Sequence, residues 1–212
     1  MKKVLVFGMT DNPGGMESVI MNYYRHIDRS VLQFEFLCNT EKVAYEDEIR
    51  KLGGVIHNIC ARSKNLKQYK HDMTEFFKNN AEKYCALWFN TCSLSNIDYL
   101  VYATKYHIPK RIIHCHNAAN GGDSFLRNLL HKYHQRKVFK YATDFWTCNQ
   151  DSDLWFFGKS SKELPNYRVI YNAIDLDYFA PNDEIRKEYR SKLNISNEIL
   201  LGHDGRFKYK KN

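Results

Sequence analysis

The amino-acid sequence lacks the long apolar stretches and cysteine pairs that mark membrane-spanning proteins and metal or redox centres. No apolar run approaches the ~20 residues of a membrane-spanning helix, and no signal-peptide core precedes the first strand-like run, which begins at Lys2. The six cysteines are widely spaced without a CxxC pair, which is more typical of small buried thiols than of a metal or redox centre. We therefore expect a cytoplasmic protein.

Signatures of several common activities are missing as well. The sequence has neither the GxGxxG of dinucleotide-binding folds nor the GxxxxGK[ST] of P-loop proteins, and it has no GxSxG nucleophile elbow. No two carboxylates are placed as a pair for glycoside hydrolysis, and no helix-turn-helix, zinc-finger or RNP pattern indicates nucleic-acid binding. Hydrolase and nucleic-acid functions therefore lose support.

The composition is that of a globular protein with a basic surface. The 212 residues are 43% hydrophobic and 26% charged, and 32 Lys and Arg against 24 Asp and Glu give a net charge of +8. Such an excess favours anionic partners, among them nucleotides, nucleic acid, phosphorylated substrates and acidic membranes. The sign of the charge alone does not choose among them.

Short apolar runs alternate with longer amphipathic runs, which predicts an α/β fold with a Rossmann-like parallel sheet. The first helix carries an apolar stripe of Met16, Val19, Ile20, Tyr23 and Ile27. We expect strands at residues 3–8, 33–38, 55–59, 85–89, 111–116, 144–147 and 168–171, and helices at 15–27, 45–52, 66–80, 97–106 and 124–141.

The alternation loosens after residue 171. A loop through Pro181, a short charged helix at residues 184–193 and a new apolar run at 199–201 are typical of a linker followed by a second unit. We therefore expect one domain over residues 1–171, a linker over 172–198, and the first strand and glycine loop of another domain over 199–212.

Two glycines precede the first helix, in "MTDNPGGMESV". Gly14 and Gly15 let a ligand approach the backbone closely, and the amides of a helix N-terminus favour an anion such as a phosphate. A tight turn between strand and helix is an equally good interpretation of the same spacing.

Two histidines end the fifth predicted strand, in "IIHCHNAANGGDS". His114 and His116 are two residues apart, so both point to one face of the strand, at the carboxyl end where open α/β sheets bind ligands. An imidazole there can hydrogen-bond a hydroxyl, contact a phosphate or transfer a proton. One of the pair can equally be a buried structural histidine, and the position nearer the strand end favours His116.

The helix that follows is strongly basic. Arg127, Lys132, Arg136, Lys137 and Lys140 surround a stripe of Leu126, Leu129, Leu130 and Tyr133. A basic amphipathic helix can lie on an anionic membrane surface. The more common arrangement is a solvated basic face over a stripe packed in the core.

Six segments in order resemble the GT-B glycosyltransferases of family 4, particularly bacterial enzymes of capsular and exopolysaccharide synthesis. They are "GGMESVIMNYYRHID", "FLCNTEKVAYEDEIRKLGGVIHNI", "HCHNA", "CNQDSDLWFFG", "VIYNAIDLDYF" and "GHDGRFKYKKN". The resemblance covers nearly the whole chain. It implies two Rossmann-like domains facing across a cleft, the first binding the acceptor and the second the nucleotide-sugar donor.

The resemblance also implies roles for particular residues. Gly14 and Gly15 are expected near the donor phosphates or the transferred sugar, and His116 is expected to touch that sugar, with His114 and Asn117 as candidates on the acceptor side. Arg206 and Lys211 match the pair that clamps the donor diphosphate, where two cations stabilise the charge that develops on the leaving nucleotide. Transfer is expected to retain the anomeric configuration and to need no metal or other cofactor.

One element of the family is absent. No two glutamates stand eight residues apart, so the Glu-x7-Glu that positions the donor has no counterpart here. We therefore expect an acceptor-binding half with little or no activity by itself.

The predicted enzyme adds a sugar to a saccharide, expected to be lipid-linked, at the inner face of the membrane, with Arg127, Lys132, Arg136 and Lys137 as membrane contacts. The alternative is a non-catalytic nucleotide- or sugar-binding module.

Overall fold

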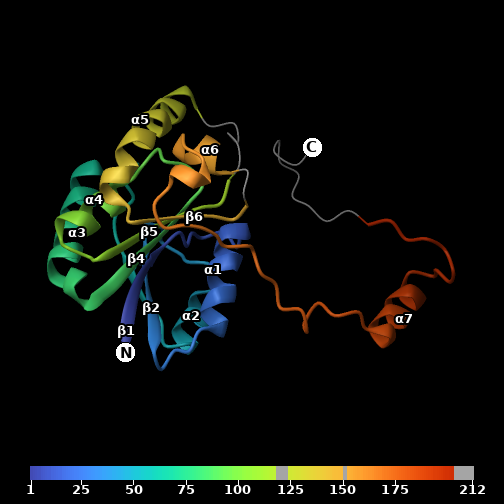
Figure 1. The fold of residues 1–212 in the computed structure, drawn as a ribbon. Coiled ribbons are helices and arrows are strands. Elements are labelled where there is room, and N and C mark those ends of the chain that lie inside the picture. Colours follow the sequence, from blue (N-terminus) through green and yellow to red (C-terminus); the bar gives the residue numbers. More distant parts are fainter. Residues whose placement is uncertain (118–123, 150–151, 203–212) are drawn as a thin grey trace. The chain divides into compact units, whose positions relative to one another are not determined.

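The computed structural model describes residues 1–117, 124–149 and 152–202 and divides the chain into two units, Met1–Ala173 and Ile174–Asn212 (Figure 1). The first unit is built on one sheet of seven parallel strands, which confirms the predicted α/β fold. The strands are β1 (Lys2–Phe7), β2 (Leu32–Cys38), β3 (Val55–Asn58), β4 (Tyr84–Thr91), β5 (Lys110–Cys115), β6 (Asp144–Thr147) and β7 (Tyr167–Val169).

The strand order is β3-β2-β1-β4-β5-β6-β7, so the chain builds one half of the sheet outward from β1 and then the other half outward from β4. The register between β1 and β4 shifts once, between Lys3 and Val4, and beyond that shift Val6 lies opposite Trp88. Between β4 and β5, Asn90 lies opposite His114. Ligands of open α/β sheets bind at the carboxyl edge where this reversal of order occurs. The reversal here lies between β1 and β4.

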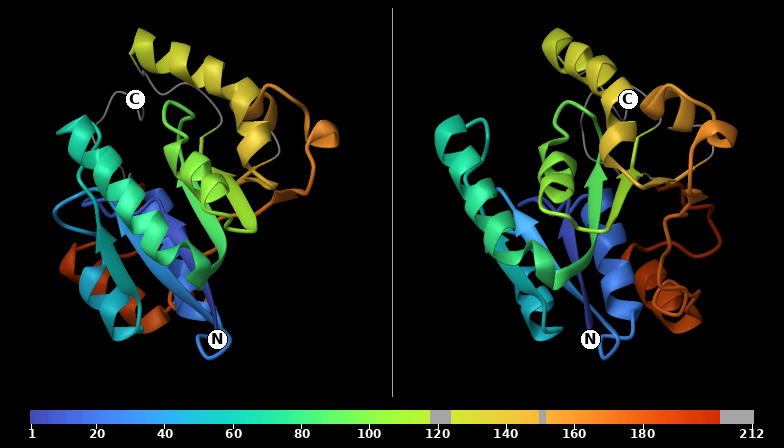
Figure 2. Two further views of the ribbon diagram at one scale, coloured as in Figure 1. Left: turned by 90° about the vertical axis from the view of Figure 1, so that its left-hand side faces the viewer. Right: turned by 60° about the vertical axis from the view of Figure 1, so that its left-hand side comes forward.

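The helices cover the two faces of the sheet unequally (Figures 1 and 2). One face packs against α1 (Gly15–His26) and α2 (Glu46–Lys51), around a core that includes Val6, Ile20, Phe36 and Trp88. The opposite core contains residues of the remaining helices of the first unit. These are α3 (Leu66–Asn80), α4 (Asp98–Lys105), α5 (Phe125–Tyr141) and α6 (Ser152–Phe157).

The predicted helices form, with differences of one or two residues at their ends. The buried side of α1 is rotated from the predicted stripe, because it includes Glu17, Met21 and Tyr24, whereas Met16 and Tyr23 are only partly buried. Helix α6 was not predicted from the sequence. It is six residues long, and its Phe156 and Phe157 are buried in the core on the α5 side.

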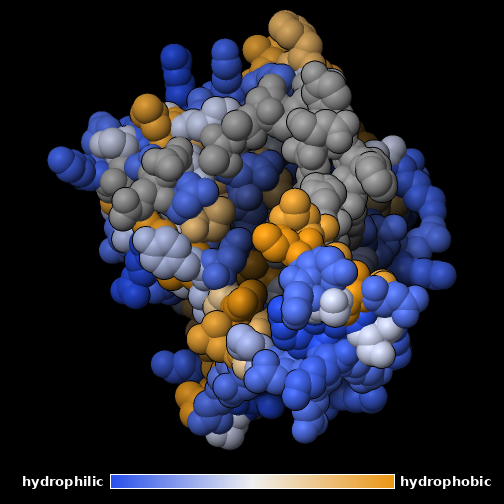
Figure 3. Space-filling view, turned by 90° about the vertical axis from the view of Figure 1, so that its right-hand side faces the viewer, coloured by the Kyte–Doolittle hydropathy of each residue, from blue (hydrophilic) through white to orange (hydrophobic). Residues whose placement is uncertain are grey.

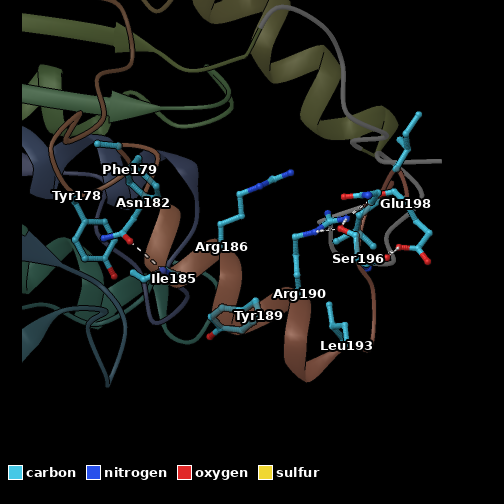
Figure 4. Close-up of a pocket in the computed structure, with 14 residues that line it drawn as sticks. Tyr178, Phe179, Asn182, Ile185, Arg186, Tyr189, Arg190, Leu193, Ser196 and Glu198 are labelled. Carbon is cyan, nitrogen blue, oxygen red and sulfur yellow. Dashed lines mark hydrogen bonds between the residues drawn. The ribbon is translucent and has the colours of Figure 1, made fainter.

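The second unit contains one described helix, α7 (Asp183–Lys192), which has no buried residue. The Asn182 side chain caps it by accepting a hydrogen bond from the Ile185 amide, 2.9 Å away. A hollow of about 860 Å³ runs along α7, and Arg190 donates to the Ser196 and Glu198 carbonyls beside it (Figure 4). The strand predicted at residues 199–201 is not formed, and its apolar side chains are exposed.

Candidate functional site

The candidate site lies at the carboxyl edge of the sheet, where β1, β4 and β5 end side by side. Asn90 near the end of β4 is fully buried, and its Oδ1 lies 2.9 Å from Nε2 of His116, which directly follows β5. The Asn90 amide nitrogen donates to the Phe7 carbonyl of β1 at 3.2 Å and to the Trp88 carbonyl at 3.3 Å. One side chain therefore ties the three strand ends together.

His116 is the predicted site residue that the fold places best for contact with a ligand. Its backbone amide donates to the Thr91 carbonyl at 3.1 Å, which holds the residue beside the end of β4, and its side chain is partly exposed. Burial lowers the pKa of His116 to about 4. The ring is therefore neutral near pH 7 and can both donate and accept a hydrogen bond.

His114 lies beneath His116, with the two ring centroids 4.3 Å apart. It is fully buried between Trp88 and Trp146, and neither of its ring nitrogens has a partner among the described residues. Burial, with a smaller contribution from His116, lowers the pKa of His114 to about 3. The two histidines therefore differ in exposure: the His114 ring is buried, whereas the His116 ring is partly exposed at the carboxyl edge of the sheet.

Asn117 follows His116, and its side-chain amide donates to the Cys92 carbonyl at 3.3 Å. Its own carbonyl accepts a hydrogen bond from Cys115 Sγ at 3.0 Å. The first contact joins the loops that follow β4 and β5, and the second fixes Asn117 against the last residue of β5. Asn117 therefore belongs to the same edge of the sheet as His116.

The glycine pair at the start of α1 differs in its surroundings. A Cβ on Gly14 would lie 2.8 Å from Oε2 of Glu17, whereas a Cβ on Gly15 would meet no atom within 4 Å. Glu17 is buried, and its Oε1 accepts a hydrogen bond from Thr10 Oγ1 at 2.6 Å. A carboxylate of the chain itself therefore lies at this helix N-terminus, where it interacts favourably with the helix dipole.

The basic helix α5 exposes four of its large apolar side chains to solvent. The exposed fractions of Phe125, Leu126, Leu129 and Tyr133 are 85%, 63%, 55% and 54%, and the helix contains no acidic residue. Helix α5 forms the upper edge of the first unit in Figure 1, and Figure 3 shows hydrophobic residues exposed at that edge. The expectation of a stripe packed in the core was wrong, because only His131 and Val138 of α5 are buried.

Four cations accompany these apolar residues on α5, namely Arg127, Lys132, Arg136 and Lys137, which are all exposed. Lys137 Nζ lies 4.2 Å from the centroid of the Tyr133 ring and donates to the Tyr133 hydroxyl. Lys159, in the loop after α6, lies over the Phe139 ring at 4.7 Å. A groove between α5 and this loop is lined by Lys132, Arg136 and Lys159 together with aromatic rings.

Two polar residues of the site were not singled out in the sequence. Asn90 follows a strand-like apolar run, but it belongs to no sequence motif that would mark it as a site residue. The sequence indicates the role of Glu17 only weakly. Glu17 lies on the same side of α1 as the buried Ile20, Met21 and Tyr24, and a carboxylate buried there needs a hydrogen-bond donor as its partner. Arg206 and Lys211, the predicted diphosphate clamp, lie outside the described residues.

Neither a metal centre nor a membrane span is found in the described part of the chain. No cluster of three or more His, Cys, Asp or Glu side chains there could hold a metal ion. None of the described helices has the length and apolar character needed to cross a bilayer.

The parallel sheet with helices on both faces defines a Rossmann-like domain of the kind found in GT-B glycosyltransferases, which confirms the predicted resemblance at the level of fold. No protein-family profile matches the chain. One curated relative, EpsF of Bacillus subtilis (strain 168), which is named as a provisional glycosyltransferase, is 29% identical over 215 residues. That alignment covers 100% of this chain and 56% of EpsF.

Two solved structures share the fold at low sequence identity. Alr3699/HepE of Anabaena, crystallised with UDP and glucose, superposes with a TM-score of 0.69 at 17% identity, over 98% of this chain and 54% of that one. A glycosyltransferase from Rickettsia africae ESF-5 gives a TM-score of 0.63 at 13% identity, over 93% and 51% of the two chains. This chain therefore spans about half the length of the proteins that it matches.

Proposed function

We propose that this chain is the acceptor-binding half of a retaining glycosyltransferase that uses a nucleotide-sugar donor. The observation that carries the proposal is the position of His116, a neutral imidazole at the carboxyl edge of the sheet, beside the end of β4 and hydrogen-bonded to Asn90. The fold shared with a protein crystallised with UDP and glucose, and the similarity to EpsF along the whole chain, support the same assignment.

In this proposal His116 contacts the transferred sugar. A neutral imidazole suits that role, because sugar hydroxyls donate and accept hydrogen bonds and carry no charge for a cation to pair with. Gly15, where a side chain would meet open space, leaves room for a ligand beside the start of α1. Glu17 beside Gly14 disfavours a second anion at that place, so we assign the donor diphosphate to Arg206 and Lys211.

The acceptor is proposed to be a saccharide carried on a lipid, in the synthesis of a capsular polysaccharide or exopolysaccharide. Helices of an α/β sheet begin at the carboxyl edge of the strands, so the exposed first turn of α5 lies at the same edge as His116 (Figure 1). Apolar side chains flanked by cations are the chemistry that binds an anionic membrane surface. Contact through α5 would hold the site near a lipid-linked acceptor at the inner face of the membrane.

The experiment that tests the proposal uses a fusion protein in which this chain replaces the aligned part of EpsF. Transfer of radiolabelled sugar from a set of UDP- and GDP-sugars to a bacterial lipid extract is measured for the fusion, for EpsF and for the 212-residue chain. We expect transfer by the fusion, unaffected by EDTA because no metal is required, and little or none by the chain alone. An inactive fusion beside an active EpsF would count against the proposal, and so would robust turnover by the chain alone.

A non-catalytic nucleotide- or sugar-binding module is the alternative, because it would share the fold and the strand-end groups. It predicts that the fusion binds a sugar or nucleotide without ever transferring it. The same assay separates the two functions, since only the enzyme yields labelled lipid.

A further inference from the structure

The orientation of the Asn90 side chain follows from its hydrogen bonds. Its amide nitrogen faces two backbone carbonyls, those of Phe7 at 3.2 Å and Trp88 at 3.3 Å, and carbonyl oxygens only accept hydrogen bonds. Rotating the amide by 180° would bring Oδ1 against both carbonyls, with no proton between the oxygens. The nitrogen therefore stays on the β1 side, and Oδ1 faces His116.

This orientation determines which nitrogen of His116 carries the proton. Oδ1 has no proton to give, so the contact of 2.9 Å is a hydrogen bond only if Nε2 is the donor. A neutral imidazole has one proton, and when it lies on Nε2, the lone pair of Nδ1 is free to accept. No described residue hydrogen-bonds Nδ1, and the His116 side chain is partly exposed.

Gly8 allows the close approach on which this arrangement depends. Its φ of +134° lies in a region that other residues rarely adopt, and a Cβ there would stand 2.7 Å from the Asn90 Cβ and 3.2 Å from the Asn90 carbonyl oxygen. Any side chain at position 8 would push β1 and Asn90 apart. The glycine thus keeps the Phe7 carbonyl within reach of Asn90.

We propose that Asn90 is a positioning residue that holds His116 as its Nε2–H tautomer, so that Nδ1 accepts a hydrogen bond from a hydroxyl of the bound sugar. The sugar as ligand rests on the proposed function, whereas the tautomer rests on the hydrogen bonds of Asn90 alone. A histidine-to-hydroxyl contact is directional, and in the other tautomer Nδ1 would be a donor and the contact would reverse. Asn90 therefore determines which kind of hydroxyl contact His116 can make.

The test is a long-range ¹H–¹⁵N NMR measurement of the His116 ring in the 212-residue chain at pH 7. We expect a protonated, pyrrole-type Nε2 and an unprotonated, pyridine-type Nδ1. Asn90→Ala should release the ring to a mixture of tautomers. Asn96→Ala is the matched control, because the Asn96 side chain also makes two hydrogen bonds, with Tyr69 and Asp98, but none with His116. It should leave the His116 signals unchanged.

A second variant separates positioning from a purely structural role and covers the case that Asn90→Ala does not fold. In Asn90→Asp the side chain still accepts from Nε2 but no longer donates to the Phe7 and Trp88 carbonyls. We expect Nε2 to stay protonated and the pKa of His116 to rise. An Nδ1–H ring in the unmodified chain, or Asp and Ala variants that release the ring equally, would overturn the inference. A locked Nε2–H ring in a fusion that transfers no sugar would contradict the proposed function but not the role of Asn90.

Discussion

At the scale of single residues, the site depends on long-range packing that a linear sequence reveals only in part. His116 is predictable, because polar residues at strand ends mark the binding edge of an α/β sheet. Asn90 is not, because its role appears only when β1, β4 and β5 are paired, and Phe7 lies 83 residues away in sequence. The same holds for Gly8, whose close neighbour is Asn90 rather than a residue of its own turn.

Gly8 and Gly15 provide a matched pair of substitutions at this scale. Gly8→Ala should lower the free energy of unfolding by more than about 2 kcal/mol, because it combines an unfavourable φ with a clash against Asn90. Gly15→Ala should be neutral or stabilise by up to about 1 kcal/mol, because the new methyl group meets open space at the start of a helix. Urea unfolding of both variants measures the difference, and equal effects would show that β1 and β4 do not approach as described.

At the scale of elements, the sequence predicts the existence of α5 and its length, but not which of its sides is covered. Its apolar residues recur with the spacing of a packed stripe, yet Leu126, Leu129 and Tyr133 are exposed because no described element of the first unit covers them. Periodicity reports that a helix has an apolar side, whereas tertiary neighbours decide whether that side is buried. Because these apolar side chains are exposed beside cations, α5 is a candidate for contact with a membrane.

Neutralising the α5 cations tests that contact. Changing Arg127, Lys132, Arg136 and Lys137 to Gln should weaken binding to liposomes rich in phosphatidylserine by at least about 10-fold, since each cation near such a surface contributes on the order of 1 kcal/mol. Co-sedimentation at physiological ionic strength measures the binding.

The control for this experiment neutralises four exposed lysines on and after α3, namely Lys67, Lys70, Lys78 and Lys83, which changes the net charge equally. The control variant should bind nearly as well as the unmodified chain. Equal binding by the α5 variant and the unmodified chain would exclude α5 as the membrane contact.

A second polar network joins strands β1, β2, β3 and β4 through their side chains. Glu35 of β2 accepts hydrogen bonds from Lys3 Nζ of β1 at 2.7 Å and from the Tyr84 hydroxyl of β4 at 2.7 Å, and it lies 2.8 Å from His57 Nε2 of β3. Burial opposes ionisation of this carboxyl, but the bonds from Lys3, Tyr84 and His57 outweigh it and lower its pKa to about 2. An ionised Glu35 therefore stabilises the folded sheet.

The stability that Glu35 contributes should depend on pH with a known sign. Because its folded pKa is lowered, the contribution is fully present above the unfolded value near 4.5 and is lost as the pH falls through about 2. We expect this contribution to be on the order of 2–3 kcal/mol. In urea unfolding the difference between the unmodified chain and Glu35→Gln should thus shrink between pH 4.5 and 2.

The matched control is Glu41→Gln, since Glu41 pairs with Lys64 on the surface, where both side chains are largely exposed. Its unfolding curve should follow that of the unmodified chain at every pH, because exposed ion pairs contribute little. A Glu35→Gln difference that stays constant with pH would contradict an ionised, hydrogen-bonded Glu35.

At the scale of the whole molecule, the alternation of apolar runs predicts a parallel sheet but not its strand order. The order follows from the crossing between β3 and β4, which places β4 beside β1 and creates the binding edge. The strand predicted at residues 199–201 failed for a related reason. An apolar run becomes a strand only where a neighbouring strand pairs with it, and the described residues of the second unit contain no strand that could do so.

The most direct test of the central claim is the effect of His116→Ala on sugar transfer by the fusion protein. Loss of one hydrogen bond to the transferred sugar should lower kcat/KM by roughly 10- to 100-fold. His107→Ala is the control, because His107 lies in the loop before β5 rather than at the carboxyl edge of the sheet, and it should leave the rate nearly unchanged. A His116→Ala fusion that transfers sugar at the unmodified rate would contradict the assignment of His116 as the sugar-contacting residue.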